Sequence, residues 1–197
     1  MSKRPIFLLL TFLLATCGGK PTSGLSTPSA DQIKLEEQAV YAVLLKDTYS
    51  SSTIVIMDTT STDPGGAVGS SSTIGYVLEN MHDVDPSTPE NFKVRNDKAY
   101  PLAADMDLGV QYILLSQDQR NEMFGQNQSG WEVFYHNYPN SPGITELSRV
   151  GFNNALDQAL VYVGTQSNYL AGAGYYILLK KVEGTWTIDQ KVMTWIS

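Results

Sequence analysis

The sequence contains one cysteine, Cys17, and two histidines, His82 and His136, in 197 residues. A single cysteine excludes an intramolecular disulfide, so the fold must be stabilised by its hydrophobic core. Two histidines and one cysteine do not supply the ligands of a zinc site at any recognised spacing. We therefore expect no metal site.

The motifs that carry common enzyme chemistry are also absent from the sequence. It has no Gly-x-Ser-x-Gly elbow and no Ser-x-x-Lys pair that would supply an activated nucleophile. Gly172-Ala173-Gly174 lacks the third glycine and the following helix of a dinucleotide-binding loop. We assign no catalytic residue and no cofactor from the sequence.

Basic residues are few. The chain has 13 Lys and Arg against 20 Asp and Glu, which gives a net charge of −7. Because nucleic-acid-binding domains present a basic patch, this balance argues against a nucleic-acid partner. The apolar content of 42% and the charged content of 17% are typical of a globular protein rather than a disordered one.

The N-terminus has the parts of an export signal. Lys3 and Arg4 give it a basic start, and an apolar run over 5–14 leads to Leu14-Ala15-Thr16-Cys17. The run is too short to span a bilayer, which needs about 20 apolar residues. Leu14-Ala15-Thr16-Cys17 resembles the lipobox of bacterial lipoproteins, with Thr16 where that pattern usually has Gly, Ala or Ser. The resemblance implies that residues 1–16 are a removable signal peptide and that Cys17 is lipidated. The alternative is a conventional signal peptide with a passenger cysteine.

Residues 17–30 have the composition of a flexible linker, rich in Gly, Ser, Thr and Pro. On a random-coil estimate this linker reaches roughly 20 Å, enough to clear the lipid head groups. Two or three acyl chains on Cys17 would anchor the protein permanently, since each buried CH₂ contributes about 0.8 kcal/mol. Loss of Lys3 and Arg4 leaves 11 basic and 20 acidic side chains, a net charge of −9. We expect an exported protein held at the cell envelope, on the periplasmic side or the cell surface.

Helical patterns dominate the part of the chain that follows the linker. A helix over 31–48 places Val40, Tyr41 and Leu44 on one face, with Glu36 and Glu37 toward its positive end. A β-branched run over 53–59 predicts a buried strand. The further expectations are a loop over 63–72, a helix over 73–81 with Ile74, Val77, Leu78 and Met81 inward, a loop over 82–89 with a turn at 90–92, a strand over 110–115, a helix from the capping box Ser116–Gln119 to Gly125, and a helix over 131–138.

The last third of the sequence is strand-rich. Strands are expected over 144–152, 158–163, 174–182 and 185–196, with Glu183-Gly184 as a two-residue hairpin turn. Alternation places Trp186, Ile188, Val192 and Ile196 on one face of the last strand. We predict a single α+β domain over 31–197, with N-terminal helices packed on an antiparallel meander of about four C-terminal strands plus one or two earlier strands.

Runs in this last third carry a family resemblance. Leu147-Ser148-Arg149-Val150-Gly151-Phe152-Asn153, Gly172-Ala173-Gly174-Tyr175-Tyr176 and Gly184-Thr185-Trp186 are among them. Together they resemble a group of uncharacterised bacterial exported proteins. The resemblance implies export but no activity, so it assigns no functional residue.

Four side chains are candidates for a binding surface. Arg149 interrupts an apolar strand, where a guanidinium can hold an anionic ligand through two hydrogen bonds, or can serve as an outward arginine or a structural ion pair. Trp131 and Tyr135 belong to the aromatic face of the helix over 131–138, which could stack on a sugar or form core. Tyr175 follows a glycine-rich turn, and tyrosine gives contact area at low entropy cost.

Acidic residues offer the main enzymatic alternative. Asp83, Asp85, Asp105 and Asp107 could supply the two carboxyl groups that an acid–base hydrolase needs in one cleft. We expect instead a non-enzymatic binding or interaction module, anchored to the membrane through Cys17, with an envelope protein or a glycan as partner. A purely structural envelope component is the third hypothesis.

Overall fold

The computed structural model describes residues 28–49, 52–62, 73–125 and 129–197. Within these ranges the chain forms one α+β domain, as the sequence predicts. The helices are α1 (Ala30–Tyr49), α2 (Thr73–Asn80), α3 (Ser87–Arg95), α4 (Gln117–Phe124) and α5 (Gly130–Asn137). The strands are β1 (Ile54–Met57), β2 (Tyr112–Leu115), β3 (Ile144–Leu147), β4 (Gly151–Phe152), β5 (Gln158–Asn168), β6 (Ala171–Val182) and β7 (Thr185–Ile196). None of these helices combines the length and the apolar character needed to cross a bilayer.

Three of the expected segments lie partly or wholly outside these ranges. The signal peptide over 1–16 and the loop over 63–72 are outside the described residues, as is most of the linker over 17–30. The first helix begins at Ala30, one residue earlier than expected, and Ser29 caps it by accepting a hydrogen bond from the Gln32 backbone N–H at 3.1 Å.

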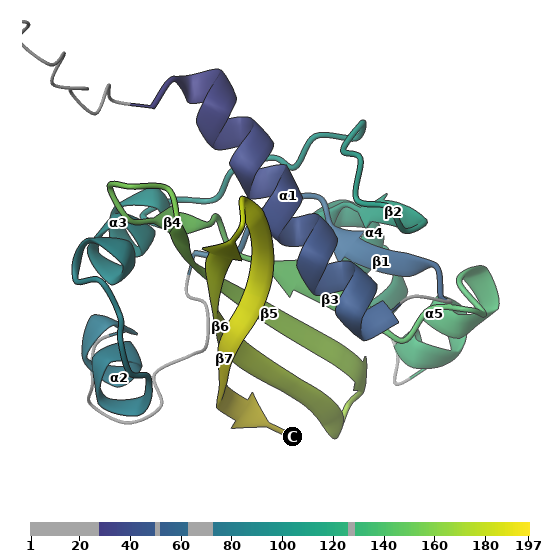
Figure 1. Ribbon diagram of the computed structural model, residues 1–197. Helices are drawn as coiled ribbons and strands as arrows, with labels where there is room; N and C mark the ends of the chain where they lie inside the picture. Colours follow the sequence, from purple (N-terminus) through teal and green to yellow (C-terminus); the bar gives the residue numbers. More distant parts are fainter. Residues whose placement is uncertain (1–27, 50–51, 63–72, 126–128) are drawn as a thin grey trace, which may run out of the picture.

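A mixed sheet forms the middle layer of the domain (Figure 1). Its strand order is β2-β1-β3-β5-β6-β7, and the short strand β4 pairs with β5 outside this order. The C-terminal strands pair antiparallel and form the predicted meander. The two earlier strands extend the sheet differently, because β1 is parallel to both β2 and β3.

Helix α1 crosses one face of the sheet (Figure 1). It buries Val40, Tyr41, Leu44 and Leu45 against the side chains of that face, which include Leu147. This is the main core, and the apolar face of α1 expected from the sequence is the face that forms it.

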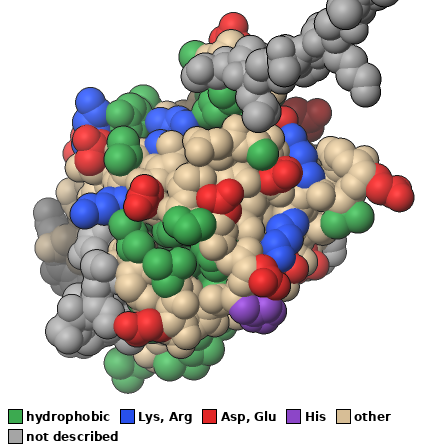
Figure 2. All heavy atoms as spheres, turned by 60° about the vertical axis from the view of Figure 1, so that its left-hand side comes forward, with side chains coloured by type: hydrophobic (Ala, Val, Ile, Leu, Met, Phe, Trp, Pro, Cys, Tyr) green, Lys and Arg blue, Asp and Glu red, His purple; other side chains and the backbone are tan. Residues whose placement is uncertain are grey.

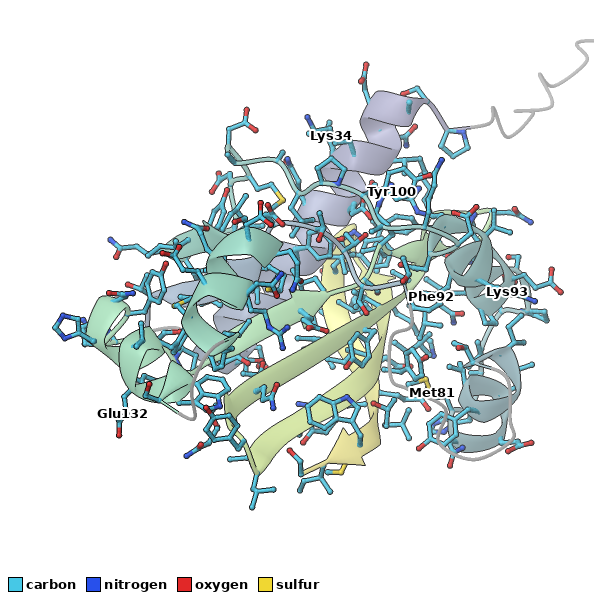
Figure 3. All side chains as sticks on the ribbon, turned by 180° about the vertical axis from the view of Figure 1, so that it is seen from behind. Lys34, Met81, Phe92, Lys93, Tyr100 and Glu132 are labelled. Carbon is cyan, nitrogen blue, oxygen red and sulfur yellow. The ribbon has the colours of Figure 1, made fainter. Side chains whose placement is uncertain are left out.

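Two helical pairs cover the opposite face of the sheet (Figure 3). Near β5 and β6, Val77, Met81 and Phe92 of the α2–α3 region pack on Leu160 and its neighbours. Near β1 and β2, the α4–α5 region packs an aromatic cluster on the sheet, with members Trp131, Phe134, Val55, Met57, Leu115 and Ile144. The domain therefore has three layers, with α1 alone on the face that carries the candidate site.

Two short-range sequence signals are confirmed. The Ser116 side chain accepts a hydrogen bond from the Gln119 backbone N–H at 3.1 Å, while the Gln119 side chain accepts one from the Ser116 N–H at 2.9 Å. Helix α4 then ends at Gly125. Glu183 and Gly184 have φ values of 51° and 81°, as a tight turn between antiparallel strands requires.

The loop and turn expected over 82–92 are wrong for the second half of that segment, which forms α3. The prolines that suggested a loop are compatible with the helix: Pro86 is its N-cap and Pro89 lies in its first turn, where backbone N–H groups lack helical partners anyway. The expectation for the preceding helix is also partly wrong, because Leu78 is 46% exposed while Val77 and Met81 are buried.

The sheet departs from simple alternation in two places. The strand expected over 144–152 is broken between β3 and β4 by Ser148, Arg149 and Val150. The pairing of β7 with β6 shifts in register between Leu178 and Leu179 of β6. As a result, Ile188 packs with the α1 core, whereas Val192 packs with the core on the opposite face of the sheet. The single face expected for β7 is therefore wrong, because a β-bulge reverses the side-chain alternation.

Candidate functional site

A cavity of about 300 Å³ lies between the first half of α1 and the segment over 100–106. One face of α1 forms one wall, this segment forms the other, and Arg149 contributes from the break between β3 and β4. Figure 3 shows Lys34 and Tyr100, one from each wall, at the same end of the molecule near the start of α1. The cavity is at the small end of the size range of small-molecule sites.

Arg149 and Glu37 form a bidentate ion pair at this cavity. The Nε and Nη2 groups of Arg149 donate hydrogen bonds to Oε1 and Oε2 of Glu37 at 2.8 and 2.9 Å. The Val150 backbone N–H donates a third hydrogen bond to Oε1 at 2.9 Å. Glu37 is 8% exposed, so its charge is held inside the protein by these donors.

The backbone of Arg149 is fixed by Asn96, the residue that ends α3. Its N–H donates to Oδ1 of Asn96 at 2.8 Å, and its carbonyl accepts from Nδ2 of Asn96 at 3.0 Å. The Asn96 amide thus takes the place of a neighbouring strand, which explains why the strand can break here. The guanidinium also lies over the Tyr100 ring, with Cζ 4.7 Å from the ring centroid.

A second arginine approaches the same carboxylate. Nη2 of Arg95 lies 3.0 Å from Oε1 of Glu37. Neither Nε nor Nη2 of Arg95 makes a hydrogen bond within the described part of the chain, although both atoms are buried. The close approach therefore stabilises Glu37 through charge rather than through a directed hydrogen bond, and two cations surround one anion.

These contacts set the ionisation of the pair. Burial raises the pKa of Glu37, but the Arg149 hydrogen bond, the Arg95 charge and the Val150 N–H together outweigh burial, and the pKa falls below its usual value. Burial lowers the pKa of Arg149, and the hydrogen bond and charge of Glu37 more than reverse this effect. Both residues are charged at neutral pH.

Tyr41 lies beneath the pair, one helical turn after Glu37. Its hydroxyl donates a hydrogen bond to the Ser148 carbonyl at 2.7 Å, which ties α1 to the start of the break in the sheet. Burial and the neighbouring Glu37 charge raise the pKa of Tyr41 well above its usual value. The Tyr41 hydroxyl is therefore a structural donor and not a titrating group.

The second wall of the cavity is pinned to the end of β1. The Tyr100 carbonyl accepts from the Thr60 N–H at 2.8 Å, and the Leu102 N–H donates to the Asp58 carbonyl at 2.7 Å. Farther along, the Met106 N–H donates to the Tyr112 hydroxyl at 2.9 Å. Backbone bonds at both ends hold this segment in place, so the cavity is formed before any ligand arrives.

The four candidate binding residues are not brought together. Arg149 lines the cavity. Trp131 is 7% exposed and packs against Phe124 and Phe134 on the opposite face of the sheet, where it is a core side chain. Tyr135 is half-buried in the same cluster and donates a hydrogen bond to the Ser167 carbonyl at 2.8 Å. Tyr175 lies on β6 with Nζ of Lys191 4.0 Å from its ring centroid.

The four aspartates of the enzymatic alternative are also separated. Asp83 and Asp85 lie between α2 and α3, where Asp85 accepts hydrogen bonds from the Ser87 hydroxyl and backbone N–H. Those bonds lower the pKa of Asp85, which favours the charged form over a proton-donating one. Asp105 and Asp107 lie next to the β2 edge of the sheet. The two pairs therefore do not share a cleft.

Among the described residues, neither metal-binding side chains nor clusters of like charge form a second candidate site. His82 and His136 are exposed, and no group of three or more His, Cys, Asp or Glu side chains in the described ranges could hold a metal ion. On the surface seen in Figure 2, basic and acidic side chains are interspersed, with no large area of one sign. The expectation against a nucleic-acid partner stays a prediction.

Glu37 is a site residue that was not predicted from the sequence. Glu37 was expected only as a charge near the positive end of a helix, yet it lies three and four residues before Val40 and Tyr41, on the buried face of α1. A carboxylate on an apolar helical face needs a buried cationic partner. That signal predicts a buried cationic partner for Glu37, but it does not indicate which arginine or lysine is the partner.

The arrangement suits binding more than acid–base chemistry. Glu37 is the sole carboxyl group among the described residues that line the cavity, and two arginines hold it ionised, so it can neither donate a proton nor pair with a second carboxyl there. In comparisons with known proteins, the chain matches no protein-family model, no curated protein and no solved structure.

Proposed function

We propose that this protein is an exported, lipid-anchored binding protein of the bacterial cell envelope, and that it takes a small ligand in the cavity beside Arg149. The observation that carries the proposal is the cavity itself, formed between α1 and the segment over 100–106 with an arginine in its wall. Concave sites with apolar walls and a few fixed polar groups are the usual form of small-molecule sites.

The polar group of the cavity is held rigidly. Glu37, Asn96 and Tyr100 fix the guanidinium and the backbone of Arg149 from three sides. A rigid site loses little conformational entropy when a ligand binds, so even a small ligand can bind usefully. This argues for a ligand site rather than for a purely structural envelope component, whose interior has no need of such a space.

The expected anchor would keep the cavity close to the membrane. Ala30, Ile33 and Lys34 line the cavity, and α1 begins at Ala30 directly after the linker over 17–30. A lipid on Cys17 would therefore hold the cavity within roughly 20 Å of the bilayer on a random-coil estimate. A ligand captured there would be one present in the envelope, and an envelope protein or glycan partner stays a further prediction.

Ligand binding in the cavity is tested by NMR shift mapping with a library of soluble small molecules on purified protein carrying Cys17→Ser. We expect shifts on α1 and on the segment over 100–106. Ala103→Trp fills the cavity and should abolish these shifts, whereas Ala104→Trp, one residue farther and outside the lining, should preserve them. Shifts confined to other surfaces, or equal effects of the two variants, would contradict the proposal.

The anchor is tested separately in cells. A palmitate analogue fed to growing bacteria should label the wild-type protein and leave Cys17→Ala unlabelled. We expect the wild-type protein in the membrane fraction and Cys17→Ala in a soluble exported fraction. Label on both proteins, or on neither, would refute lipidation at Cys17 without bearing on the cavity.

A further inference from the structure

We propose that the cavity beside Arg149 selects a small anionic amphiphile, a molecule with one carboxylate or similar anionic head and an apolar body. This inference rests on the proposed function, because it names the ligand class of the same cavity. It follows from the charge of the lining, from the unused donor of Arg149 and from the apolar walls.

The lining has an excess of positive charge in an acidic protein. Among the described lining residues, Lys34 and Arg149 are cations and Glu37 is the one anion. Arg95, behind the lining, adds a further positive charge within 3.0 Å of Glu37. The chain as a whole has a net charge of −7, so the charge of this site is opposite in sign to that of the whole chain. An anionic head is the complement of this arrangement.

Arg149 retains a donor for that head. Its Nε and Nη2 groups are committed to Glu37, but Nη1 makes no hydrogen bond with the described residues. The Arg149 side chain is 22% exposed, so part of its guanidinium is accessible from the cavity. Hydrogen bonds from a guanidinium to a carboxylate are charge-assisted and about twice as strong as neutral ones.

Lys34 gives the site a second cation, on a flexible side chain. It lies on α1 one turn before Glu37 and is exposed at the rim. No ion pair joins Lys34 to another described residue, whereas Lys180 and Lys181 are both paired with acids. Lys34 is therefore available to a ligand, and its substitution should leave the fold unchanged.

The remaining lining is apolar. Of the twelve described residues that line the cavity, eight are aliphatic, aromatic or proline, so a purely hydrophilic ion would leave most of these walls without a partner. Leu102 and Met106 from one wall face Ile33 and Tyr41 from the other across this space. An apolar body buried here would be removed from water, which is favourable in proportion to the apolar area buried.

The test compares three probes that share one chain length and differ in head group: decanoate, decyltrimethylammonium and 1-decanol. Binding is measured by NMR titration of the purified protein carrying Cys17→Ser. We expect decanoate to shift resonances of Lys34, Tyr100 and Leu102, with an affinity at least about tenfold above that of decyltrimethylammonium, a difference equivalent to about 1.4 kcal/mol. Equal or tighter binding of the cation in the cavity would overturn the inference.

Charge variants test the mechanism. Lys34→Gln should weaken decanoate about threefold to fivefold, as loss of one exposed charge contact predicts. Lys34→Glu should weaken it further and raise the affinity for decyltrimethylammonium. Lys93→Gln, on the exposed side of α3, is the control and should change neither affinity (Figure 3). Unchanged head-group preference in Lys34→Glu would also overturn the inference.

The remaining outcomes separate this inference from the proposed function. If none of the three decyl probes binds while the small-molecule library still maps to the cavity, the ligand class is wrong and the binding function stands. If nothing maps to the cavity, both fail. Oleate carried in phosphatidylcholine vesicles distinguishes a membrane source from a dissolved one: transfer to the protein supports the former, and binding of free decanoate without transfer supports the latter.

Discussion

Arg149 and Glu37 lie 112 residues apart in the sequence and meet through two parallel hydrogen bonds of 2.8 and 2.9 Å. The contact joins α1 to the break between β3 and β4, and it forms the charged part of the cavity. It therefore does two things at once: it holds the helix against the sheet, and it positions the guanidinium that we propose for ligand binding.

Removing the Glu37 charge should lower the stability of the fold. Glu37→Gln leaves Arg95 and Arg149 without a counter-charge in a mostly buried site, and breaking a buried pair in this way costs about 3–5 kcal/mol. We expect a loss of about 3 kcal/mol in the free energy of unfolding, measured by denaturant titration. Glu132→Gln, an exposed change on α5, should stay within about 0.5 kcal/mol of wild type. Equal stability of the two variants would refute the structural role of Glu37.

The same pair predicts a pH dependence. The folded-state pKa of Glu37 lies below its ordinary value of 4.5, so the ionisation-linked part of its stabilisation is fully present above that value. It is lost as the pH falls below 4.5 and through the lower folded-state pKa. The stability gap between wild type and Glu37→Gln should be constant from neutral pH to about pH 5 and should narrow in acid. A gap that widens in acid would contradict the lowered pKa.

Trp195 and the glycines beneath it offer a test of the sheet packing. A Cβ on Gly174 would come within 2.1 Å of the Trp195 indole nitrogen, which donates a hydrogen bond to the Tyr162 hydroxyl at 2.8 Å. Gly174→Ala should therefore cost about 1–3 kcal/mol. In a Trp195→Ala background most of that cost should vanish, which a double-mutant cycle measures. Strictly additive effects would mean that the indole does not lie over Gly174.

The hairpin between β6 and β7 predicts one stabilising and one destabilising change. Glu183 has a φ of 51°, so Glu183→Asn should raise the free energy of unfolding by about 0.5 kcal/mol. Gly184 has a φ of 81° and open space around its Cβ position, so Gly184→Ala should lower it by about 1 kcal/mol through backbone strain alone. Thermal unfolding of both variants checks the two signs, and a stabilising Gly184→Ala would be inconsistent with the turn.

Short-range signals predicted much of this fold. Ser116 and Gln119 mark the start of α4 because a capping box involves four adjacent residues, and Glu183-Gly184 marks a hairpin because only certain residues adopt positive φ. The apolar face of α1 predicted its burial. Each of these features depends on interactions within a few residues, which the sequence pattern contains directly.

The features that define the candidate site depend on distant contacts. The sequence singled out Arg149 as a candidate, but its strand breaks because Asn96, 53 residues earlier, bonds its backbone. Its partner Glu37 and its stacking partner Tyr100 come from two other segments. A local sequence pattern does not predict such long-range contacts. The bulges in β7 likewise depend on its pairing with β6.

The most direct test of the account is native mass spectrometry of the protein purified from the envelopes of its own cells. We predict that wild type and Ala104→Trp carry a bound small molecule and that Ala103→Trp, with its cavity filled, does not. All three proteins should show similar thermal unfolding, so that loss of the ligand cannot be attributed to loss of the fold. A wild-type protein without any bound molecule, or an Ala103→Trp protein that keeps the same one, would contradict the proposal that this cavity is the binding site.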